Sequence, residues 1–122
     1  MNRLMCRLIL SALLLVPAYS VARASIQRLT QIGPAYSTSN VTIAAISGQR
    51  NCISELTVTS DAAFDFIILN GGTTVYTVTM VADGGLVRSW DDASAICGGS
   101  NTAVYLNVTA GTFDINYSGF TR

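Results

Sequence analysis

The chain has 122 residues, about the size of one domain, with seven arginines, seven acidic residues, no histidine and no lysine. Without histidine or lysine it lacks the commonest general base and the usual Schiff-base nucleophile, so we expect no enzyme, no metal site and no cofactor. It has no cluster of positive charge, so neither nucleic acid nor an anionic membrane surface is an expected partner.

Residues 1–24 have the features of a secretory signal. Met1–Arg7 carries two arginines and no acidic residue, Leu8–Val16 is almost wholly apolar, and Ala22-Arg23-Ala24 offers small residues for cleavage. The apolar run is shorter than the roughly 20 residues that cross a bilayer, and an uncleaved membrane anchor is the alternative interpretation. Cleavage after Ala24 leaves 98 residues with four arginines against seven carboxylates. The protein is therefore expected to be secreted, periplasmic or at the cell surface, with no membrane contact once cleaved.

The cysteines fit the same compartment. Cys6 lies in the signal, so Cys52 and Cys97 remain as an even pair, and a disulfide between them is expected. It would close a loop of about 46 residues, for which chain entropy gives a stabilisation of roughly 4 kcal/mol. The alternative is a reactive or metal-binding thiol, but neither a histidine partner nor a C-x-x-C spacing is present.

Alternation of apolar and polar residues predicts strands from residue 25 onward. Phe113, Ile115 and Tyr117 alternate with polar residues, and the same period of two recurs in the other β-branched segments. Residues 64–69 are nearly all apolar, which favours a central strand buried on both faces. One helical turn could follow over 91–96. Strands are predicted near residues 26–32, 40–46, 51–59, 63–70, 73–80, 86–90, 102–109 and 112–120.

Glycine-rich turns separate these strands, and Asn70-Gly71-Gly72 is a strong hairpin signal. Short strands joined by such turns indicate an all-β fold. We expect an antiparallel β-sandwich of jelly-roll-like type with about eight short strands, spanning residues 40–122. The weakly patterned segment 25–39 is predicted to be an extended N-terminal arm.

The strongest local cluster of chemical groups is Asp91-Asp92 after Trp90. Paired carboxylates can bind Ca²⁺ or act as acid and base, with Asp61 or Asp65 as further members if the fold brings them close. The alternative is a turn in which Asp caps one helical turn. Trp90, the sole tryptophan, is either an exposed anchor for a partner or a side chain buried in the core or an interface.

Tyrosines with Asn and Thr neighbours could form a carbohydrate- or protein-binding face, or could simply suit a solvated sheet. The tyrosines concerned are Tyr36, Tyr76, Tyr105 and Tyr117. The candidate partner surface comprises Trp90, Asp91, Asp92, Tyr76 and Tyr105. Asn40, Asn107 and Asn116 fit the glycosylation acceptor pattern, which matters only on a eukaryotic secretory route.

From Val41 onward the order of motifs resembles a known family. The motifs are Gly48-Gln49-Arg50, Gly71–Tyr76, Ala82–Val87, Trp90-Asp91 and Asn101–Thr109. This order is similar to that of small β-sandwich proteins of tailed-phage virions, of the head-decoration or auxiliary structural kind. The resemblance implies a sandwich fold and self-association, with a homotrimer as one form.

The leading expectation is an exported, non-enzymatic structural or binding module. Its partners would be proteins or further copies of itself, and carbohydrate is a further candidate ligand. The first alternative is a phage-like virion decoration or structural protein. The second is a secreted hydrolase that uses Asp91, Asp92 or Asp65, which would need two of these carboxylates in one cleft.

Overall fold

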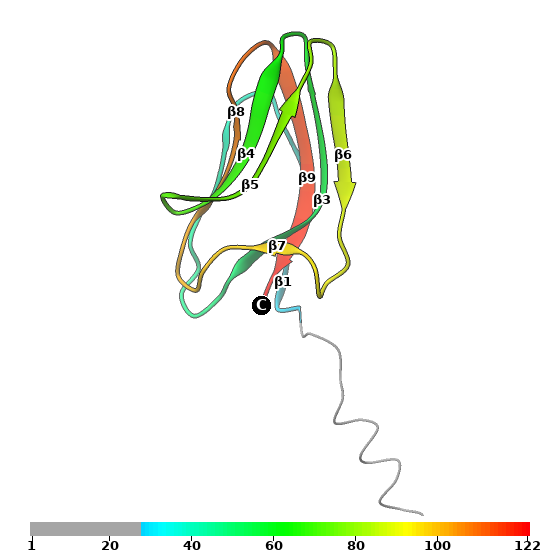
Figure 1. The fold of residues 1–122 in the computed structure, drawn as a ribbon. Coiled ribbons are helices and arrows are strands. Elements are labelled where there is room, and N and C mark those ends of the chain that lie inside the picture. Colours follow the sequence, from blue (N-terminus) through cyan, green and yellow to red (C-terminus); the bar gives the residue numbers. More distant parts are fainter. Residues whose placement is uncertain (1–27) are drawn as a thin grey trace, which may run out of the picture.

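The computed structural model describes residues 28–122, so the predicted signal lies outside the described residues. These residues form nine strands (Figure 1). The strands are β1 (Thr30–Ser37), β2 (Val41–Ile43), β3 (Asn51–Ser60), β4 (Phe64–Asn70), β5 (Thr73–Met80), β6 (Gly85–Ser89), β7 (Ile96–Cys97), β8 (Val104–Val108) and β9 (Phe113–Thr121). Within this part of the chain no helix has the length and apolar character needed to cross a membrane.

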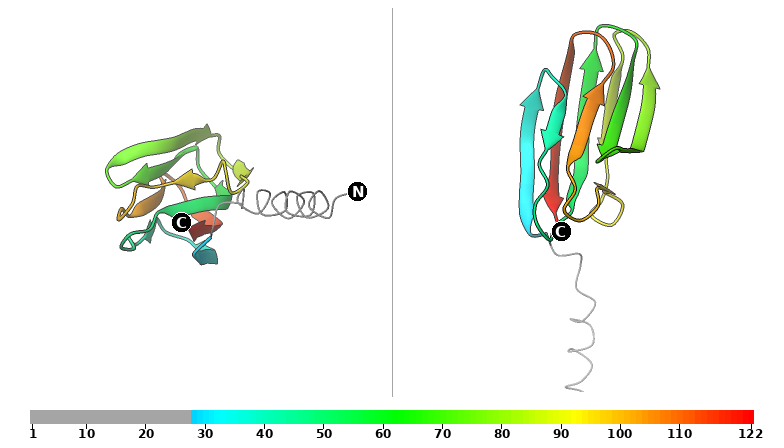
Figure 2. Two further views of the ribbon diagram at one scale, coloured as in Figure 1. Left: turned by 90° about the horizontal axis from the view of Figure 1, so that it is seen from below. Right: turned by 90° about the vertical axis from the view of Figure 1, so that its left-hand side faces the viewer.

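The strands form two antiparallel sheets that pack face to face (Figure 2). One sheet has the order β1-β9-β3-β6, with β7 also pairing with β3, and the other has the order β2-β8-β4-β5. Apart from β7, successive strands alternate between the sheets, except in the β4–β5 hairpin. This is the strand order of a jelly roll, so the predicted antiparallel sandwich is confirmed.

The core lies between the sheets and follows the predicted alternation. Its fully buried apolar side chains come from β3, β4, β8 and β9, and include Ile53, Leu56, Val58, Phe66, Ile68, Leu106 and Ile115. The expectation that 64–69 is buried on both faces is wrong. Phe66 and Ile68 are fully buried, whereas Ile67 and Leu69 on the outer face remain partly exposed because no second layer covers that face.

The N-terminal region differs from its prediction. β1 begins at Thr30 and pairs with β9, so much of the segment predicted as an arm over 25–39 is an edge strand of the sandwich. The strand predicted over 26–32 overlaps β1 only at residues 30–32, and residues 26 and 27 lie outside the described residues. A bulge between Ile32 and Ala35 contains Gly33 at φ +67° and Pro34, and it breaks the alternation that would reveal the strand. The strand predicted over 40–46 is shorter in the structure, where β2 has only three residues.

The predicted disulfide between Cys52 and Cys97 is present. β7 is a two-residue strand that the sequence did not indicate, and it places Cys97 directly opposite Cys52 on β3. The Cα atoms of the two cysteines are 4.0 Å apart, and Cys52 is fully buried. Disulfides of this kind persist in oxidising compartments, so the bond is compatible with an extracellular location.

Candidate functional site

Trp90 lies at the margin of the core, where the edge strands of the two sheets face each other. Its backbone N–H donates to the Ser54 carbonyl at 2.8 Å, and its ring is partly buried against the core. The ring meets Tyr76 of β5 edge to face, with 5.7 Å between centroids. Arg88 Nε donates to the Tyr76 hydroxyl at 3.3 Å. Two members of the candidate partner surface, Trp90 and Tyr76, are therefore in contact.

Asp91 and Asp92 each have a local partner. Asp91 accepts hydrogen bonds from the Ser94 hydroxyl and backbone N–H, which lower the pKa of Asp91. These contacts close a turn, as the alternative interpretation expected, but residues 91–96 form no helical turn, since 92–94 are a turn and Ile96 begins β7. Asp92 forms a bidentate ion pair with Arg28, and this pairing lowers the pKa of Asp92. Both groups are exposed, so the pairs contribute little to stability.

The structure separates the other carboxylates considered with that pair. Asp65 lies near the start of β4 and accepts a hydrogen bond from the Thr79 hydroxyl at 2.5 Å. Asp91 and Asp92 follow β6 at the opposite end of the sandwich (Figure 1). Neither Asp65 nor Asp61 therefore approaches them.

The four tyrosines considered as one binding face do not share a face. Tyr36 is 62% exposed and points out from the β1-β9-β3-β6 sheet. Tyr117 and Tyr76 pack inward against the core. Tyr105 lies between the buried Val104 and Leu106, so it points out from the other sheet. Tyr105 is thus on the opposite side of the molecule from Tyr36 and on the opposite face of its sheet from Tyr76.

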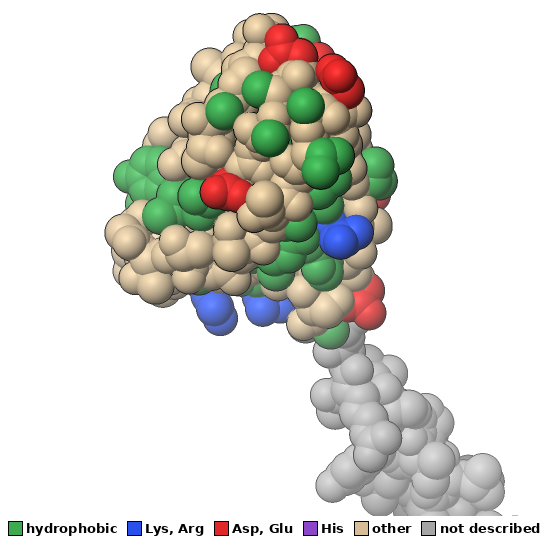
Figure 3. Space-filling view, turned by 45° about the horizontal axis from the view of Figure 1, so that its top comes forward, with side chains coloured by type: hydrophobic (Ala, Val, Ile, Leu, Met, Phe, Trp, Pro, Cys, Tyr) green, Lys and Arg blue, Asp and Glu red, His purple; other side chains and the backbone are tan. Residues whose placement is uncertain are grey.

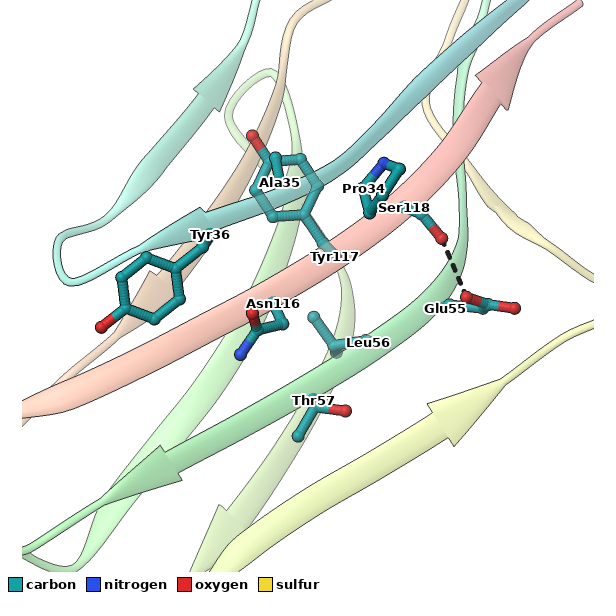
Figure 4. A pocket seen from close by; sticks show the side chains of 9 residues that line it. All are labelled: Pro34, Ala35, Tyr36, Glu55, Leu56, Thr57, Asn116, Tyr117 and Ser118. Atoms are coloured by element: carbon teal, nitrogen blue, oxygen red, sulfur yellow. Dashed lines mark hydrogen bonds between the residues drawn. The ribbon is translucent and has the colours of Figure 1, made fainter.

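A shallow depression lies on the outer face of the first sheet, across β1, β9 and β3 (Figure 4). We call it the outer groove, and its volume is about 270 Å³. Its lining comprises Pro34, Ala35, Tyr36, Glu55, Leu56, Thr57, Asn116, Tyr117 and Ser118. The first three come from β1, the next three from β3 and the last three from β9, and the polar groups of β3 and β9 are Glu55, Thr57, Asn116 and Ser118.

Hydrogen bonds hold several groups of the outer groove in place. The Ser118 hydroxyl donates to Glu55 Oε2 at 3.1 Å. The Tyr36 hydroxyl donates to Asp114 Oδ1 at 2.6 Å, and this bond raises the pKa of Tyr36. The Tyr36 ring is thereby tethered at its far end while remaining mostly exposed. The groove thus combines a fixed aromatic ring with a carboxylate, an amide and hydroxyls.

Of the groove residues, the sequence predicted Tyr36 and Tyr117 for a binding face and Asn116 as a glycosylation acceptor. The alternating pattern does place Glu55, Thr57 and Asn116 on polar faces of their strands. The pattern does not show that β3 and β9, more than 50 residues apart, pair along nine positions. The missing signal is this long-range pairing.

Acidic side chains gather at the end of the sandwich formed by the β3–β4, β5–β6 and β8–β9 turns (Figure 3). Asp61, Asp83 and Asp114 border a second depression there. Asp61 already accepts the Thr112 backbone N–H at 2.7 Å, and Asp114 accepts the Tyr36 hydroxyl. Over residues 28–122, no group of three or more His, Cys, Asp or Glu side chains is placed to hold a metal ion.

The three glycosylation triplets lie in different settings. The Asn40 side chain accepts the Val108 backbone N–H at 2.9 Å, Asn107 is partly buried on β8, and Asn116 is exposed in the outer groove.

Comparison with protein-family models and with curated proteins finds no match to this chain.

Proposed function

We propose that this chain is an exported, non-enzymatic binding module whose outer groove takes a carbohydrate. The observation that carries the proposal is the outer groove itself, with an exposed, tethered Tyr36 ring beside polar side chains of both hydrogen-bonding types. Sugar rings present one apolar C–H face together with hydroxyls that donate and accept. An aromatic ring suits the first, and amide, hydroxyl and carboxylate groups suit the second.

The outer groove offers these groups within one open surface. Asn116 supplies two donors and an acceptor, Thr57 and Ser118 supply hydroxyls, and Glu55 accepts. The site is shallow and open to water, so each contact competes with solvent. We therefore expect weak binding, with Kd of about 0.1–1 mM for a single site.

Two further features support an exported binding module rather than an enzyme. The signal-like features of residues 1–24 and the Cys52–Cys97 disulfide both favour an oxidising compartment outside the cytoplasm. The chain has no histidine or lysine, and Asp91 and Asp92 are engaged by Ser94 and Arg28. The aromatic, amide, hydroxyl and carboxylate groups of the outer groove can bind a ligand without any catalytic step.

Binding of the purified protein to an array of immobilised oligosaccharides tests this function. Tyr36→Ala should weaken binding of the best ligand at least tenfold because it removes the aromatic face. Tyr105→Ala is the matched control, since it removes a tyrosine from the opposite side of the sandwich and should leave binding unchanged. Absence of binding to every sugar, or equal loss in both variants, would contradict the proposal.

The second candidate is a virion decoration or structural protein. The jelly-roll strand order favours it, because viral capsid domains and lectins share that architecture. Purified virions from the source would contain this chain in stoichiometric amount if this candidate is right. Its recovery only as a free exported protein would refute it.

A further inference from the structure

Three of the four sheet edges carry features that block pairing with another strand. β2 has three residues, and β6 has five and carries Arg88. β1 contains the bulge at Gly33-Pro34, and proline lacks a backbone N–H. Short length, charge, proline and bulges are the devices by which sheet edges avoid unwanted partners.

β5 differs from the other edges. It has eight residues and contains neither proline nor a charged side chain. Its register with β4 shifts only between Ile68 and Leu69, which leaves Tyr76–Met80 as a regular stretch. Among residues 28–122, β4 is its only neighbour in the sheet, so its other edge presents backbone groups that pair with no strand of this part of the chain.

We propose that Tyr76–Met80 pairs antiparallel with the same stretch of a second copy, across a two-fold axis at Val78. This register places Tyr76 opposite Met80, Thr77 opposite Thr79, and Val78 opposite itself. The two sheets of the order β2-β8-β4-β5 then join into one continuous sheet. The contact is isologous and closes at two copies.

The side chains of β5 match each other in this register. Tyr76, Val78 and Met80 face inward and are partly buried against the core, so a paired strand covers part of their remaining exposed surface. A methionine sulfur beside an aromatic ring is a favourable contact, as is a cross-strand Thr–Thr pair. Because the stretch has no charge, two copies meet without repulsion between like charges.

The interface is small, with five residues of backbone pairing from each copy. Its area falls below that of stable protein complexes, so the dimer is weak and forms in the micromolar range. The outer groove lies on the other sheet, and the dimer leaves it open. This inference is therefore independent of the proposed carbohydrate binding.

Sedimentation equilibrium of the full chain, expressed with its leader and recovered after export, tests the pairing. Measurements from about 5 to 500 μM bracket a weak interface of this size. The wild type should pass from monomer to dimer. Thr77→Lys should shift dimerisation to at least tenfold higher concentration. Thr77 is exposed on β5 next to the two-fold axis, so the lysines introduced in the two copies would repel each other.

Thr42→Lys is the matched control, because Thr42 is exposed on β2 at the opposite edge of the same sheet. This variant should dimerise like the wild type. Thr77→Glu guards against an effect peculiar to lysine, and thermal melting checks that each variant folds. A wild type that stays monomeric, forms trimers, or dimerises equally with Thr77→Lys would overturn the proposal.

Discussion

Gly119 of β9 is the position where the structure tolerates a side chain least. A Cβ atom there would lie 1.9 Å from the Cys52 carbonyl oxygen and 2.9 Å from its carbonyl carbon. It would also lie 3.1 Å from the Ile53 Cα. All three atoms belong to the backbone of β3, beside the disulfide, so no side-chain rotation relieves the clash.

Gly119→Ala must therefore separate β9 from β3 where the two strands are both buried. Overpacking a core costs about 1–3 kcal/mol when side chains can adjust, and a clash with backbone belongs at or above the upper end. The variant should lose roughly 3 kcal/mol or more of unfolding free energy. For a domain of this size that is a fall in Tm of about 12–24 °C.

Thermal and urea unfolding followed by circular dichroism measure this loss. Gly72→Ala is the control, because its added Cβ meets nothing within 4 Å in the β4–β5 turn. Its stability should stay within about 1 kcal/mol of the wild type. A Gly119→Ala variant as stable as Gly72→Ala would refute the close approach of β9 to β3.

Three further predictions concern the disulfide, an ion pair and the core. The double variant Cys52→Ala/Cys97→Ala should lose up to about 4 kcal/mol of stability in urea unfolding, and an unchanged midpoint would contradict a stabilising bond. Arg28→Gln should raise the pKa of Asp92 towards its ordinary value in an NMR titration. In the wild type the lowered pKa gives a small stabilisation that is present above pH about 4 and is lost as the pH falls through the folded-state pKa. An unchanged pKa in the variant would argue against the pair. Phe66→Ala should cost about 3–5 kcal/mol because the ring is fully buried, and a cost below about 1 kcal/mol would place it outside the core.

Local signals in the sequence were sufficient for much of the fold. Alternation and glycine turns predicted strands over 63–70 and 73–80, and the structure has them at Phe64–Asn70 and Thr73–Met80. Parity and compartment predicted the disulfide. Each of these features depends on residues close together in sequence or on the two cysteines that lie beyond the predicted signal.

The features that the sequence did not predict have other causes. The alternation in β1 is interrupted at Gly33-Pro34, and β7 has only two residues, which is too short for any period. The outer groove requires β9 to lie between β1 and β3, which is a long-range arrangement. Single-sequence patterns report which face a side chain occupies, but they do not report which strand lies beside it.

We propose, as the central claim, that this domain works outside the cytoplasm after removal of residues 1–24, and the structure closes it with one disulfide. Intact-mass measurement of the protein recovered after expression of the full sequence, residues 1–122, tests that claim most directly. A chain that starts at Ser25, lighter by two hydrogens than its reduced form, is the predicted result. An unprocessed chain with free thiols at Cys52 and Cys97 would contradict it.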